Sequence, residues 1–116
     1  MWEIELFKKD NGRCPVEDFL LELNPKKDIP YIENAMKQLE EHGNKLPRPQ
    51  ASFLVDGIYE LRIKTINGKF RILYFFFDQK KIIMTNGFKK KSGPVAATHI
   101  KTAIEYRKKY YERIQK

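Results

Sequence analysis

The sequence predicts an α+β fold: a small, mostly antiparallel β-sheet with two N-terminal helices and a C-terminal helix, in the order β-α-α-β-β-β-α. Three observations support this prediction. The 116 residues have the length of one domain, so 1–116 is expected to form a single unit. A hydrophobic share of 41% is sufficient for a core. The hydrophobic period is helical near both ends of the chain and changes to two between them.

The N-terminal half is expected to contain one strand and two helices. Residues 2–6 alternate apolar and polar side chains, which is typical of a half-buried strand. Pro15 suits the first position of a short helix, because its fixed φ is helical and its missing N–H is not needed there. A second helix is expected to begin near Pro30, with Asp28 as its N-terminal cap, and to end at Gly43.

The second half predicts a β-rich segment followed by one helix. Asn67-Gly68 lies between two β-rich runs and predicts a hairpin, because a type I′ turn needs positive φ at both central positions. Apolar residues at 75–77 face both sides of the second run, so that strand is expected to be central. The last helix is expected from Gly93-Pro94 to about Ile114. The expected strands are 58–66, 70–77 and 82–85, with a shorter candidate at 53–55.

A two-residue turn at Asn67-Gly68 would fix the pairing of the hairpin strands. In that register Lys64 lies opposite Arg71, and Arg62 lies beside Lys64 on the same face. Like charges placed directly opposite each other destabilise a sheet, so Arg71→Ala is expected to leave stability nearly unchanged. We interpret this face as a phosphodiester site, the alternative being splayed, solvated side chains. The opposite face is the expected core, formed by Tyr59, Leu61, Ile63, Ile72, Tyr74 and Phe76.

The excess positive charge is concentrated in one segment. Residues 62–91 hold nine Lys or Arg and one Asp, so the net charge of this segment is +8. The formal net charge of the whole chain is also +8. A basic block on an otherwise neutral body is typical of proteins that bind a polyanion, since phosphate contacts supply most non-specific affinity for nucleic acid. The alternative is a solvated charged surface.

Other patterns exclude several classes of protein. The lone Cys14 rules out a disulfide framework and a multi-cysteine metal site, and this cysteine is expected to be inert. With two distant histidines and no acidic cluster, no metal or cofactor is expected. His42 is interpreted as structural, whereas His99 is a candidate proton-transfer group. The chain has no apolar run of the roughly 18–20 residues that a membrane span needs and no signal peptide, so a cytoplasmic location is expected.

Three motifs in order resemble HigB/RelE-type toxins of toxin–antitoxin systems, especially the phage-derived HigB-like branch. The resemblance covers essentially the whole chain, ends with Pro94 and the last helix, and implies a compact sheet backed by helices with a basic cleft. The motifs are Leu54-Val55-Asp56-Gly57-Ile58-Tyr59-Glu60-Leu61-Arg62, Gly68-Lys69-Phe70-Arg71-Ile72-Leu73-Tyr74-Phe75 and Asn86-Gly87-Phe88-Lys89-Lys90-Lys91.

This resemblance implies a metal-independent endoribonuclease that cuts mRNA on the ribosome and is silenced by a helix-turn-helix, HigA-like antitoxin. Basic side chains would hold the scissile phosphate while the ribose 2′-hydroxyl attacks in line. Many relatives carry a lysine where this chain has Ser52, and His99 is the nearest candidate for their proton-transfer group. The superfamily also contains ParE-type gyrase inhibitors, and a basic RNA- or protein-binding module without catalysis is a further alternative.

The candidate site residues come from these two sources. Lys64 is included through the hairpin register, and His99 as the nearest candidate for the proton-transfer group. The matching positions of the resemblance give Arg62, Arg71, Lys89 and Lys90. The candidate catalytic residues are Arg62, Lys64, Arg71, Lys89, Lys90 and His99, and the candidate RNA contacts are Lys69, Phe88 and Lys91.

Overall fold

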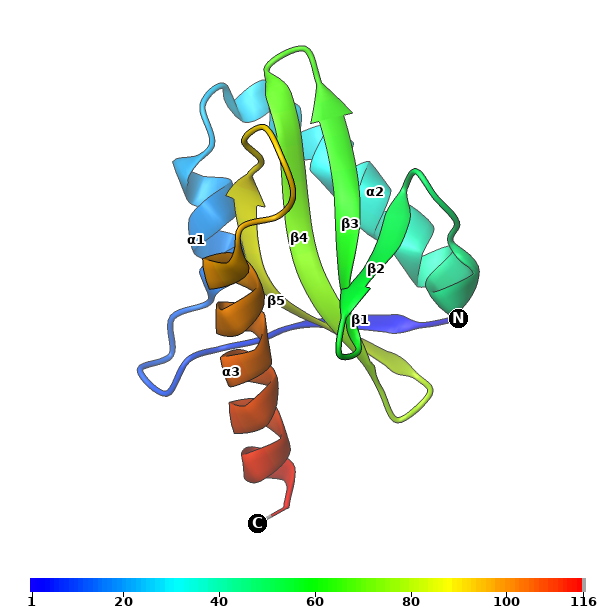
Figure 1. Ribbon diagram of the computed structural model, residues 1–116, viewed down its shortest axis with the longest axis vertical. Helices are drawn as coiled ribbons and strands as arrows, with labels where there is room; N and C mark the ends of the chain where they lie inside the picture. Colours follow the sequence, from blue (N-terminus) through cyan, green and yellow to red (C-terminus); the bar gives the residue numbers. More distant parts are fainter. Residues whose placement is uncertain (116) are drawn as a thin grey trace.

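The computed structural model describes residues 1–115 and confirms the α+β class, with five strands and three α-helices (Figure 1). The candidate strand at 53–55 is present as β2, so the sheet has one strand more than the expected order allowed. The strands are β1 (Glu3–Leu6), β2 (Ala51–Val55), β3 (Ile58–Thr65), β4 (Gly68–Phe77) and β5 (Lys81–Lys89). The helices are α1 (Pro15–Glu22), α2 (Ile29–His42) and α3 (Ala97–Ile114), with short 3-10 turns η1 (Lys26–Asp28) and η2 (Gly43–Lys45).

The sheet is mixed, in the order β1-β5-β4-β3-β2. Strands β2 to β5 pair antiparallel with their sequence neighbours, but β1 runs parallel to β5 at the far edge. The expectation of a mostly antiparallel sheet is therefore corrected in detail. The physical reason is the long connection between β1 and β2. It contains α1 and α2, and it lets β1 join the edge farthest from β2.

Helices cover both faces of the sheet, with α2 behind it and α3 in front of it in Figure 1. One core lies between α1, α2 and the face that carries Leu61, Ile72 and Tyr74. The other core lies between α3 and the face that carries Leu73 and Phe75. The middle strand, β4, is buried on both faces, which confirms the expectation drawn from the apolar run at 75–77.

The two hairpin strands pair in a register that is shifted by two residues from the one expected from the sequence. Thr65 pairs with Gly68, so the turn consists of Ile66 and Asn67, and Arg62 lies opposite Arg71. Gly68 has a positive φ, at +143°, but Asn67 does not. The prediction of a type I′ turn at Asn67-Gly68 is therefore wrong, because that turn needs positive φ at both residues. Because side chains alternate with a period of two, a slip of two residues leaves every side chain on its expected face. The core face and the basic face of the hairpin are therefore confirmed.

Asp28 explains this turn and departs from its expected role. It occupies the N-cap position of α2 but makes no capping hydrogen bond through its side chain. Its carboxylate, on a residue only 2% exposed, instead accepts hydrogen bonds from Thr65 Oγ1 at 3.2 Å and Asn67 Nδ2 at 3.1 Å. These contacts fasten the hairpin tip to the start of α2 and draw Asn67 into the turn.

Two element boundaries differ from the sequence expectation. Strand β5 extends to Lys89 because its pairing with β4 continues as far as Phe70. Helix α3 begins at Ala97, after a loop that contains Gly93-Pro94. Within residues 1–115, no helix combines the length and apolar character that crossing a membrane would require.

Gly43 gives a test of the packing between the N-terminus and α2. It ends α2 with φ of +52°, and the Trp2 indole occupies the space where a Cβ would lie. We expect Gly43→Ala to destabilise the protein by about 2–4 kcal/mol in urea unfolding, from backbone strain and overpacking together. Gly12 is the matched control, because its φ is +86° but nothing lies within 4 Å of a Cβ there. Gly12→Ala should cost only about 1 kcal/mol, and equal losses for the two variants would contradict the packing argument.

Candidate functional site

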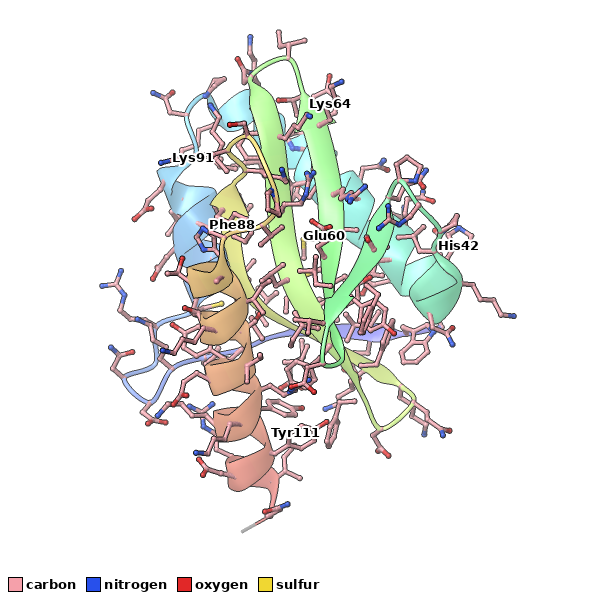
Figure 2. The ribbon with its side chains drawn as sticks, viewed as in Figure 1. His42, Glu60, Lys64, Phe88, Lys91 and Tyr111 are labelled. Carbon is pink, nitrogen blue, oxygen red and sulfur yellow. The ribbon has the colours of Figure 1, made fainter. Side chains whose placement is uncertain are left out.

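A buried carboxylate joins two arginines on the α3 face of the sheet. Glu60 is 2% exposed, and its two oxygens accept from different guanidinium groups. Arg71 Nε donates to Oε1 at 2.8 Å, while Arg62 donates through Nε at 3.3 Å and Nη2 at 3.2 Å to Oε2. Glu60 and Arg62 are two residues apart on β3, so their side chains lie on the same face of the sheet. Arg71 lies opposite Arg62 on β4. The shared carboxylate allows two cations to lie opposite each other, which would otherwise destabilise the sheet. Figure 2 shows Glu60 at the middle of this face.

Arg71 is held more firmly than Arg62. It is 7% exposed, and its Nη1 also donates to the carbonyl oxygen of Phe70 at 3.0 Å. Burial lowers the pKa of its guanidinium, and the neighbouring Glu60 carboxylate acts in the opposite direction. Arginine keeps its proton in proteins, so the result is a permanent cation with a fixed orientation. Arg71 is therefore paired with an anion, and the expectation that it faces only a like charge, Lys64, is wrong.

A cavity of about 300 Å³ opens over this face. Four cations line it, and within the described residues no carboxylate does, since Glu60 lies beneath the arginines. Lys64 and Lys69 lie directly opposite each other near the hairpin tip, and both are exposed. The cavity is lined by Pro49, Gln50, Arg62, Ile63, Lys64, Lys69 and Arg71. Its shape and charge suit an anion with several oxygens, such as a phosphodiester.

The three lysines at the end of β5 reach this end of the sheet but separate there. Lys89 pairs with Phe70, so it lies on the opposite face, toward α1, and away from the arginines. Lys90 makes hydrogen bonds to backbone carbonyl groups nearby. Its N–H donates to Lys69 O at 2.7 Å, and its ammonium group donates to Lys91 O at 3.2 Å. Lys91 is exposed in the loop that follows (Figure 2). Only part of the expected convergence on one phosphate is therefore seen.

His99 stacks on the aromatic ring of Phe88. Its imidazole lies parallel to the Phe88 ring, with 3.7 Å between the ring centroids and 3° between the planes. Phe88 lies opposite Arg71 in the sheet, so the stack is on the same face as the arginine pair. Burial lowers the pKa of His99 from its usual 6.5, which favours a neutral imidazole at pH 7. Phe88 itself is only 8% exposed, so its role here is to support His99, and little of its ring is left for RNA.

Residues 18–108 match the family described as phage-derived protein Gp49-like. The chain belongs to the Gp49-like family. This family is in general of the RelE-like, toxin type. The match begins in α1 and extends into α3, so it includes the arginine pair, Glu60 and His99. No curated protein matches the chain.

The Gp49-like chain has further polar contacts at this site that the sequence analysis missed. Asn86 Nδ2 donates to the carbonyl oxygen of His99 at 3.3 Å, which fastens the start of α3 to β5. Arg48 Nη2 donates at 2.8 Å to the hydroxyl of Ser52, which lies opposite Glu60. Ser52 therefore brings a cation to the edge of the basic face, although it is itself uncharged. The three-residue gap between Arg48 and Ser52 gives no sequence signal, because the intervening loop is irregular.

The buried ion pair reverses the stability expected for an Arg71 variant. We expect Arg71→Ala to lose about 3 kcal/mol in urea unfolding, at the lower end for a broken buried pair because Arg62 still contacts Glu60. Arg62→Ala is the matched control. It removes the other partner of the same carboxylate from a side chain that is 29% exposed, and it should cost about 1 kcal/mol. A wild-type stability for Arg71→Ala would contradict the role of this pair.

Proposed function

We propose that this protein is the toxin of a type II toxin–antitoxin system, and that it cleaves mRNA as a metal-independent endoribonuclease. The proposal is carried by the cavity that Arg62 and Arg71 line, with both arginines fixed by Glu60, and by the imidazole of His99, which stacks on Phe88, the residue opposite Arg71 in the sheet. Anion-binding groups and a group that can move a proton near pH 7 would then serve one substrate on the same face of the sheet. Membership of the Gp49-like family and the three HigB/RelE-like motifs support the same function.

The reaction assigned to this cavity is attack by a ribose 2′-hydroxyl on the adjacent phosphorus. The O2′–P bond forms and the P–O5′ bond breaks, which leaves a 2′,3′-cyclic phosphate and a free 5′-hydroxyl. His99 would accept the proton from the 2′-hydroxyl, and a donor or water would protonate O5′. The arginines would stabilise the additional negative charge on the phosphoryl oxygens in the transition state. Lys64 and Lys69 would contact neighbouring phosphates, since they lie farther along the same face.

The partners follow from this assignment. The substrate is mRNA, presented on the ribosome in the cytoplasm, and a helix-turn-helix, HigA-like antitoxin would silence the toxin. The basic face supports an RNA partner, because it gathers exposed lysines around two fixed guanidinium groups. Gyrase inhibition and RNA binding without cleavage are the outcomes against which the proposal is tested.

The decisive experiment maps mRNA ends after incubation of purified protein with programmed ribosomes. We expect discrete new 5′ ends within coding regions, detected by primer extension. Lys69→Ala should weaken cleavage and reduce the salt dependence of binding by about one phosphate contact, without changing stability. Lys37→Ala, an exposed lysine on α2, is the charge-matched control and should behave as wild type. Altered DNA supercoiling without new RNA ends would point to gyrase, and binding without new ends would exclude catalysis.

His99 gives the reaction a predictable pH dependence. The neutral imidazole is the form that accepts a proton, and burial lowers the pKa of His99 below 6.5. The single-turnover rate should therefore rise with pH through a midpoint below 6.5 and level off by pH 7. His99→Gln should remove this limb and lower the rate by about 10²- to 10⁴-fold. NMR titration of the His99 ring supplies the midpoint independently, and a kinetic midpoint that differs from it would assign the proton transfer to another group.

A further inference from the structure

A second cavity, of about 590 Å³, lies beside the hairpin tip and takes no part in the proposed chemistry. It is bounded by the start of α2 on one side and by the end of β3 with the following turn on the other. Its lining combines two cations, one tyrosine and one isoleucine with polar turn residues. These residues are Lys27, Asp28, Tyr31, Lys64, Thr65, Ile66 and Asn67.

Lys64 lines both this cavity and the basic cavity over the arginines. The edge of β3 explains how one side chain reaches both. Pairing with β2 ends at Leu61, and the N–H of Arg62 donates to Gln50 O at 2.8 Å as the last contact on that side. Beyond this point, within residues 1–115, no strand covers the outer edge of β3. A chain leaving the basic cavity can therefore pass around this open edge, beside Lys64 at the upper end of β3 in Figure 2.

The second cavity offers an aromatic surface between cations. Tyr31 is 60% exposed and Ile66 is 95% exposed, so both side chains present apolar area to solvent. Lys27 and Lys64 are also exposed. The one carboxylate in the lining belongs to Asp28, which is buried and accepts hydrogen bonds on both oxygens. An exposed ring flanked by ammonium groups is the combination that binds the base and phosphates of a single-stranded nucleic acid.

We propose that this cavity is a nucleotide subsite for single-stranded RNA, in which a base stacks on Tyr31 while the adjoining phosphates contact Lys27 and Lys64. The inference rests on the proposed function, because it requires RNA to occupy the basic cavity. Thr65 and Asn67 direct their side-chain donors to Asp28 and away from a bound base. Stacking is therefore the main contact, and the subsite accepts any base.

The test is the affinity of the full protein for a fluorescein-labelled RNA decamer made uncleavable by 2′-O-methyl groups, measured by anisotropy. Tyr31→Ala should weaken binding by roughly 5- to 150-fold, the range that stacking on one aromatic ring spans. Tyr31→Phe keeps the ring and should bind within about twofold of wild type. Both substitutions affect an exposed side chain, so unchanged thermal stability is expected and is checked for each variant.

An abasic scan of the decamer separates stacking from charge. At one position the loss of the base should weaken wild-type binding, whereas Tyr31→Ala should lose nothing further there. A Tyr31→Ala defect that persists equally at every abasic position would overturn the subsite, as would tight, Tyr31-dependent binding of an acidic glutamate peptide.

Lys69→Ala distinguishes failure of the subsite from failure of the proposed function. If Lys69→Ala weakens RNA binding while Tyr31→Ala binds as wild type, the subsite is excluded and the basic cavity stands. If neither variant changes the affinity, both proposals are excluded. Loss in both variants, with the abasic pattern above, supports the subsite.

Discussion

The Glu60 carboxylate, shared between Arg62 and Arg71, is the interaction on which the basic face depends. Two guanidinium groups directly across a strand pair repel each other, and burying one of them adds a desolvation cost. A single buried anion offsets both effects and fixes both side chains through their planar N–H groups. The local charge stays positive because one carboxylate faces two arginines. The arginines that this carboxylate fixes in the fold are therefore the same ones that line the basic cavity.

The uneven cover of the sheet follows from this cluster. On the α1–α2 face the hairpin presents apolar side chains along its whole length, and helices pack against it. On the other face the apolar residues of β4 begin only at Leu73, and α3 packs from there toward the opposite end. No helix packs on the charged half, which is bordered by the loop before β2 and the loop after β5 (Figure 1).

Much of this arrangement could be predicted from the sequence, and the rest depended on contacts between distant residues. The period of two placed Arg62, Lys64 and Arg71 on one face, and this prediction tolerated a register error because the error was an even number of residues. The register itself is set by Asp28, which contacts Asn67 across 39 positions of sequence. The stack of His99 on Phe88 likewise depends on how the loop after β5 returns α3 to the sheet. No local pattern encodes either contact.

The open edge of β3 has a consequence for solubility. A bare strand edge presents backbone groups that can recruit a strand from another molecule and so start aggregation. Lys64 lies at this edge, with Lys69 opposite it, so a second copy of the chain would bring its own lysines into the same place. This repulsion discourages edge-to-edge pairing between copies. Neutralising these lysines would therefore remove a safeguard against self-association.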